Sequence, residues 1–172
     1  MDANVLIINR RDVVKAVLCD LTLFLAVYFI PVLSHATSVP LYKFEPMRLL
    51  LFVLIFMTPK LKINHYLVAF TLPLVSYLFS GHPLFLKSLI MSIELVTNVA
   101  FLHILLKHTN VFLSIAGSIL ISKVVYYLIK IAFVSLGLLK MEIISTSIIW
   151  QVITLLMLST IGAIISKKII KE

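Results

Sequence analysis

The chain has 172 residues, of which 62% are hydrophobic and only 13% are charged, and its formal net charge is +8. A soluble domain of this size cannot bury so much apolar surface, so the composition excludes that class. It predicts an all-α integral membrane protein with a single helical domain. Open strands leave backbone groups unpaired in lipid, and the sequence lacks the alternating pattern of a membrane barrel.

Six apolar runs predict six transmembrane helices in one compact bundle. The runs cover about residues 13–33, 47–58, 65–80, 84–106, 111–138 and 143–166. The first is longer than the core of a signal peptide and contains Asp20, so we expect an uncleaved helix. The second would reach only about 18 Å as a helix, against a hydrocarbon core of about 30 Å. We therefore expect neighbouring helices to shield it, or a vestibule beside it.

The basic residues predict cytoplasmic N- and C-termini. In the six-span arrangement nine of them fall on the side of the termini, and four fall on the other side. An excess of this kind marks the cytoplasmic side of a membrane protein. The positive charge is thus topological, and we expect no nucleic-acid partner. The connection 35–44 is long enough to fold over one mouth of the bundle.

Prolines and one acid follow each other in a distinctive order along the first four runs. Pro46-Met47 opens the short run and Pro59 ends it, Pro73 interrupts the next, and Gly81-x-Pro83 precedes Met91-x-x-Glu94-Leu95. This order resembles that of the substrate-binding S components of energy-coupling factor (ECF) transporters, over residues 44–107 in motif. These six-helix proteins capture vitamins and related micronutrients. The resemblance implies three partners, a transmembrane coupling subunit and two ATPase subunits.

The first run contains the segment that the resemblance implicates in docking. S components contact the coupling subunit through a motif of small residues on the first helix, which lets helices approach closely. The nearest equivalent in this chain is Thr22-x-x-x-Ala26. Asp20 lies beside this motif. It is a candidate for the same contact, although pairing with Lys15 is the interpretation we favour.

Polar side chains form one stripe on each of the last three runs. The members are Lys87, Met91, Glu94 and Asn98; then Ser114, Ser118, Ser122, Tyr126 and Lys130, with Lys123 and Tyr127 beside them; and Ser147, Trp150, Gln151 and Thr154. Such stripes avoid lipid, so they predict a shared polar interior. For the serines we favour hydrogen bonds to their own helices.

The candidate substrate site lies in the outer half of the bundle. Glu94 and Lys123 fall about 18 and about 20 Å from the cytoplasmic ends of their helices, so they could pair, either structurally or at a ligand. For the substrate we choose Lys130 for an acidic group, Trp150 for stacking, and Asn98 and Gln151 for hydrogen bonds. Further candidates are Tyr126, Tyr42, Lys43 and Arg48. The alternatives are an interfacial aromatic belt for Trp150 and Tyr42, and snorkelling towards headgroups for Lys43 and Arg48.

The resemblance implies a non-enzymatic S subunit in a prokaryotic cell membrane that takes up a small vitamin-like molecule, and the candidate cations favour an acidic group on that molecule. We expect no cofactor and no metal, since the five histidines lie near helix ends without metal-binding spacing, as interfacial residues do. The main alternative is a small multi-span scaffold of the MreD type. An intramembrane enzyme is less favoured, because no catalytic motif occurs and no second acid is expected beside Glu94.

Overall fold

The computed structural model describes residues 10–37, 41–80, 84–139 and 147–170. Within these residues the chain forms six α-helices and one short 3-10 helix. They are α1 (Arg10–Thr37), η1 (Leu41–Phe44), α2 (Pro46–Met57), α3 (Lys62–Ser80), α4 (Phe85–Leu105), α5 (Val111–Ser135) and α6 (Ile148–Ile170). The predicted all-helical class is confirmed for the described residues, and α1, α4, α5 and α6 are long and apolar enough to cross a membrane.

The helix ends follow local chemistry. Pro46 occupies the first turn of α2, where its missing N–H is tolerated. Asn110 caps α5 by accepting a hydrogen bond from the backbone N–H of Leu113 at 2.9 Å. The helix α5 ends at Ser135 rather than at residue 138, because Gly137 adopts a φ of 71° and the N–H of Leu138 donates to the carbonyl of Phe133. This is a Schellman motif with glycine in its left-handed position.

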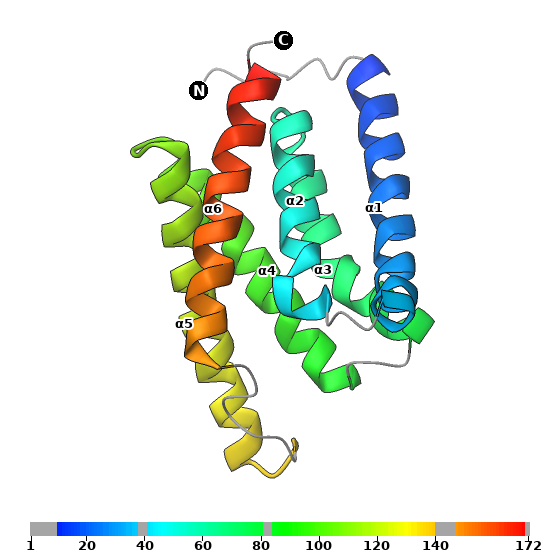
Figure 1. The fold of residues 1–172 in the computed structure, drawn as a ribbon, viewed down its shortest axis with the longest axis vertical. Coiled ribbons are helices and arrows are strands. Elements are labelled where there is room, and N and C mark those ends of the chain that lie inside the picture. Colours follow the sequence, from blue (N-terminus) through cyan, green and yellow to red (C-terminus); the bar gives the residue numbers. More distant parts are fainter. Residues whose placement is uncertain (1–9, 38–40, 81–83, 140–146, 171–172) are drawn as a thin grey trace, which may run out of the picture.

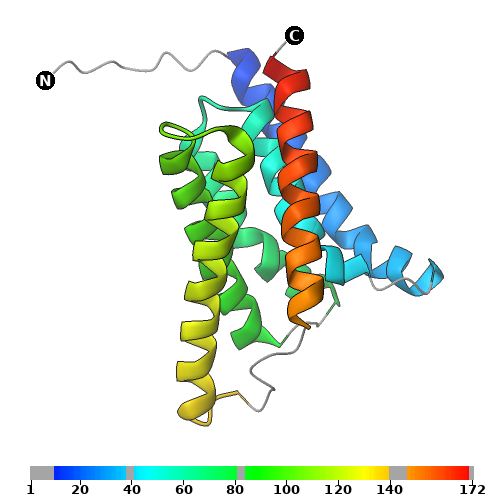
Figure 2. The same ribbon diagram turned by 60° about the vertical axis from the view of Figure 1, so that its left-hand side comes forward.

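Two helices differ from the predicted bounds in other ways. The helix α1 continues to Thr37 with Pro31 inside it, and towards that end it leans away from α6 (Figure 2). The helix α6 begins at Ile148 instead of residue 143. Residues 143–146 of the predicted run lie outside the part of the chain that the structure describes.

The short helix α2 lies inside the bundle. It packs against α1, α3 and α6, while α3, α4, α5 and α6 follow one another as neighbours. Figure 1 shows α2 between α1 and α6, and it shows the start of α1 and the end of α6 at the same end of the bundle. We call this the terminal end, and the end where α5 finishes the opposite end. The buried side chains of Leu51, Phe52 and Leu54 anchor α2 in the core.

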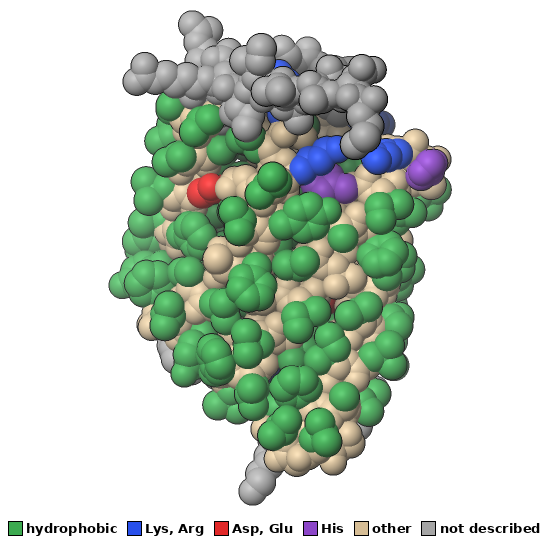
Figure 3. All heavy atoms as spheres, turned by 180° about the vertical axis from the view of Figure 1, so that it is seen from behind, with side chains coloured by type: hydrophobic (Ala, Val, Ile, Leu, Met, Phe, Trp, Pro, Cys, Tyr) green, Lys and Arg blue, Asp and Glu red, His purple; other side chains and the backbone are tan. Residues whose placement is uncertain are grey.

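The outer surface of the bundle is apolar. Large hydrophobic side chains are exposed along the four long helices. Figure 3 shows one face covered by them over most of its length, with lysine or arginine and histidine side chains gathered towards the terminal end. A surface of this kind suits contact with lipid rather than water.

Candidate functional site

Four charged side chains from different elements meet inside the bundle. Arg48 of α2 lies 2.6 Å from Glu45 (Nη1 to Oε2), and its Nη2 donates to Oε1 of Glu94 on α4. Lys123 of α5 lies 2.5 Å from Glu45 Oε1 and 3.3 Å from Glu94 Oε1. Each cation thus contacts both acids. We call Glu45, Arg48, Glu94 and Lys123 the charge quartet.

Local structure positions Glu45 at the junction of η1 and α2. It is the N-cap residue of α2, with φ 49° and ψ 53° in the left-handed region. That conformation costs a non-glycine residue about 1–2 kcal/mol. Glu45 stands three residues before Arg48, so the two side chains reach each other across the first turn. The ion pairs to Arg48 and Lys123 therefore offset the backbone cost.

The quartet confirms one sequence prediction, excludes one alternative and corrects one expectation. Glu94 and Lys123 do pair, as their similar depth predicted. Arg48 does not snorkel towards headgroups, because it is only 2% exposed and its guanidinium contacts Glu45 and Glu94 inside the bundle. A second acid, Glu45, shares the cations of Glu94, whereas none was expected there. The available signal was the i, i+3 spacing of Glu45 and Arg48 at a proline-marked helix start.

A second polar layer lies one helical turn from Glu94 on the same face of α4. The buried amide of Asn98 donates from Nδ2 to the hydroxyl of Ser118 on α5 at 3.1 Å. Its Oδ1 has no hydrogen-bond partner among the described residues. Ser114, Ser118 and Ser122 donate to carbonyls of or next to their own helix at 2.9 Å. The preferred interpretation of these serines is confirmed.

Lys130 lies on the same helix as Lys123, separated from it by an aromatic ring. The Nζ atoms of both lysines lie 5.7 Å from the ring centroid of Tyr126, which is itself buried. This distance is within the range of a cation–π contact. Lys130 is 2% exposed, so this candidate for an acidic ligand group is deeply buried. The structure thus brings Lys130 and Tyr126 next to the charge quartet.

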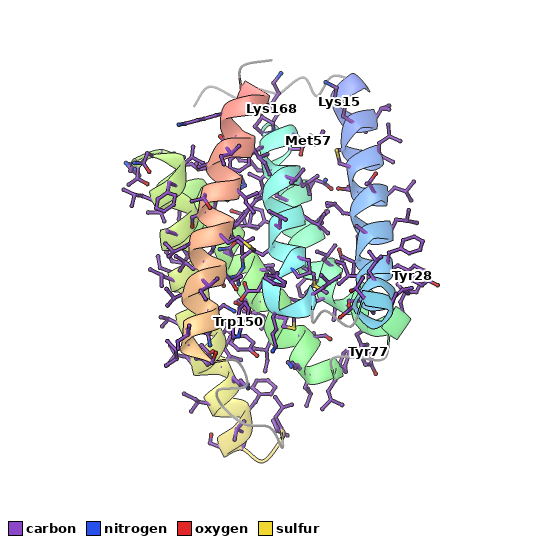
Figure 4. The ribbon with its side chains drawn as sticks, in the orientation of Figure 1. Lys15, Tyr28, Met57, Tyr77, Trp150 and Lys168 are labelled. Carbon is purple, nitrogen blue, oxygen red and sulfur yellow. The ribbon has the colours of Figure 1, made fainter. Side chains whose placement is uncertain are left out.

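A third group of predicted site residues lies where η1 meets α6. The Trp150 ring packs edge-on against Phe44, with centroids 5.9 Å apart, and Nζ of Lys43 lies 5.9 Å from the Trp150 ring. Gln151 donates from Nε2 to the hydroxyl of Tyr127 at 2.6 Å. Figure 4 shows Trp150 near the start of α6, away from Lys168 at the terminal end. The side chain of Tyr42 lies outside the described part of the chain.

The predicted docking residues lie near the middle of α1. Thr22 is exposed and donates to the carbonyl of Leu18 in its own helix at 2.8 Å, and Ala26 is half-buried. Asp20 accepts two hydrogen bonds of 3.0 Å from the amide of Asn64 on α3. The pairing of Asp20 with Lys15 was therefore wrong, since Asn64 takes that place.

Two histidines that the sequence placed at the interface form a buried contact instead. His65 of α3 is fully buried, and its Nδ1 lies 3.2 Å from Nε2 of His103 on α4. Its Nε2 lies 3.0 Å from the hydroxyl of Thr58, the C-cap residue of α2. The positions of His65 and His103 near helix ends did not predict this contact, because the contact depends on which helices pack against each other.

Comparisons with protein-family models, with curated proteins and with solved structures found no match for this chain.

Proposed function

We propose that the chain is the substrate-binding S subunit of an ECF-type importer in a prokaryotic cell membrane. It captures a small water-soluble vitamin or related micronutrient from outside, and a transmembrane coupling subunit with two ATPase subunits drives the uptake. The order of prolines around Glu94 supports the family. The exposed Thr22 and the half-buried Ala26 on α1 are the proposed contact for the coupling subunit.

The observation that carries the proposal is the charge quartet. Two acids and two bases from three helical elements meet inside a bundle whose surface is apolar. Ionisable groups within membrane segments are costly and usually mark a solute pathway or binding site. Glu45 directly follows η1, whose residues Lys43 and Phe44 contact Trp150 of α6. A cation and a flat aromatic surface near polar groups suit a small acidic ligand with a ring.

Mass spectrometry of small molecules retained through purification in mild detergent tests this function. We expect one small polar molecule to be enriched in the parent protein and lost from a Lys123→Met variant purified in the same way. Co-purification of a coupling subunit and two ATPases would support the same conclusion. Recovery of other membrane proteins with neither a small molecule nor a coupling subunit would contradict the proposal and favour a scaffold.

The proposal includes six spans with both termini in the cytoplasm, which thiol labelling in intact cells can check. In a Cys19→Ala background, cysteines replace Leu138 and Lys167, both of which are exposed. Position 138 closely follows the end of α5 and position 167 lies in the last turn of α6, and Figure 1 shows these two helix ends at opposite ends of the bundle. A membrane-impermeant reagent is expected to label position 138 and to spare position 167 until the cells are lysed. Labelling of 167 alone would reverse the orientation, and labelling of both would argue against a single one.

A further inference from the structure

The charge quartet has a sealed side and an accessible side. The side chains of Arg48 and Glu94 are 3% and 7% exposed, whereas those of Glu45 and Lys123 are both 23% exposed. An incoming solute would therefore meet Glu45 and Lys123 first. The Arg48–Glu94 contact lies behind them and closes the site on its inner side.

Glu45 is also the member that can leave most easily. Its carboxylate bridges the two cations, with Oε2 on Arg48 and Oε1 on Lys123. It is the N-cap residue of α2, and its carbonyl accepts from the backbone N–H groups of Arg48 at 3.0 Å and Leu49 at 3.3 Å, so its backbone is held by the first turn while its side chain is not part of the helix. Its left-handed backbone conformation is unfavourable for a glutamate. The side chain can leave the two cations by rotation about its own bonds, which keeps these backbone hydrogen bonds and does not unwind α2.

Arg48 is incompletely satisfied by the two glutamates. Its Nε has no hydrogen-bond partner among the described residues, and Nη1 lies close to Glu45 but outside hydrogen-bond geometry. Arginine binds a carboxylate best through two parallel N–H groups, and a buried unmet donor costs free energy. A free carboxylate, unlike that of Glu45, is not constrained by the backbone. The carboxylate of a ligand can therefore accept hydrogen bonds from Nε and Nη1 of Arg48, to which Glu45 does not hydrogen-bond.

We propose that the carboxylate of Glu45 occupies, in the empty protein, the place of a carboxylate carried by the ligand, and that the two exchange on binding. The inference rests on the proposed function and narrows its substrate class to small carboxylates. It moves the acidic group from Lys130 to Arg48 and Lys123. Charge stays balanced, because one anion replaces another between the same two cations while Glu45 turns towards the accessible side.

Rescue by acetate tests this exchange without knowledge of the natural ligand. Glu45→Gly removes the carboxylate and suits the left-handed backbone, so it vacates the position without adding strain. The purified variant is melted in mild detergent with sodium acetate or with sodium chloride at equal ionic strength. At about ten times its Kd, acetate is expected to raise the Tm of the variant by about 3–6 °C over chloride. The parent should show no difference between the two salts.

Glu94→Gln is the matched control, since it removes the sealed acid instead of the accessible one. Acetate should not rescue it. An equal effect on both variants, or no effect on Glu45→Gly, would overturn the proposal. Should Glu45→Gly not survive purification in chloride, Glu45→Asn takes its place, because asparagine tolerates the same backbone conformation. If neither survives, purification in acetate decides: recovery supports the exchange, and continued loss contradicts it.

The same experiment separates this inference from the proposed function. Rescue by acetate with neither a co-purifying molecule nor a coupling subunit would support the anion position and contradict the importer. A co-purifying molecule that lacks a carboxylate, combined with no effect of acetate, would leave the importer standing and remove the exchange.

Discussion

Replacement of Arg48 by methionine is expected to lower the free energy of unfolding by about 3–5 kcal/mol, the usual cost of removing one partner from a buried ion pair. Arg48 is 2% exposed and contacts both Glu45 and Glu94. Without it, two carboxylates share the single charge of Lys123. Unfolding of the purified protein in a detergent mixture of increasing denaturing strength measures the loss. The exposed Lys107 supplies the control, because Lys107→Met should change stability by less than about 0.5 kcal/mol.

A second substitution tells whether the loss comes from the unpaired charge. Arg48→Met combined with Glu94→Leu leaves one acid, Glu45, and one base, Lys123, which lie 2.5 Å apart. The double variant is expected to be more stable than Arg48→Met alone, since residues within one charge network are not additive. Additive losses would show that the two side chains contribute mainly through packing, and the electrostatic account of the quartet would fail.

Replacement of Lys123 by methionine is expected to weaken binding of the co-purifying molecule by roughly thirty-fold or more. Truncating one partner of a buried, hydrogen-bonded charge pair costs about 2–5 kcal/mol, and about 1.4 kcal/mol corresponds to a tenfold change in Kd. Lys123 is the cation on the accessible side of the quartet. Titration of the purified variant with that molecule, below its melting temperature, gives the Kd.

Lys130→Met is the matched comparison, because both lysines lie against the ring of Tyr126 on the same helix. A larger loss for Lys123 than for Lys130 would favour the acidic group between Arg48 and Lys123. The reverse order would favour the assignment made from the sequence, with Lys130 as its partner. Parent-like binding by both variants would place the ligand elsewhere.

The helices could be predicted from the sequence because their causes are local. Long apolar runs and a proline at a helix start, such as Pro46, act within a few residues, and the structure agrees with them at the start of α2. The serines of α5 were also predictable, since a hydroxyl in an apolar helix has a nearby backbone carbonyl as its nearest acceptor. Where local chemistry was missed, as at Gly137, the predicted end was wrong by three residues.

The candidate site could be predicted only in part, because it depends on contacts between distant segments. The similar depth of Glu94 and Lys123 was enough for that pair, as consecutive helices are antiparallel neighbours. The position of α2 relative to α4 and α5 could not be predicted from the depth of residues along consecutive helices. Its first turn brings Glu45 and Arg48 beside α4 and α5, although α2 is far from both in the sequence. Asp20 was misassigned for the same reason, since Asn64 lies on another helix.

The contact between His65 and His103 has a definite direction. Thr58 donates its single hydroxyl proton to the carbonyl of Leu54 at 2.8 Å, so at His65 Nε2 it can only accept. His65 therefore carries its proton on Nε2 and accepts through Nδ1 from Nε2–H of His103. Both hydrogen bonds are thus donated in the same direction: His103 of α4 donates to His65 of α3, and His65 donates to Thr58 at the end of α2. In neutral rings, this arrangement of hydrogen bonds uses one tautomer for each histidine and joins three helices through one chain of hydrogen bonds.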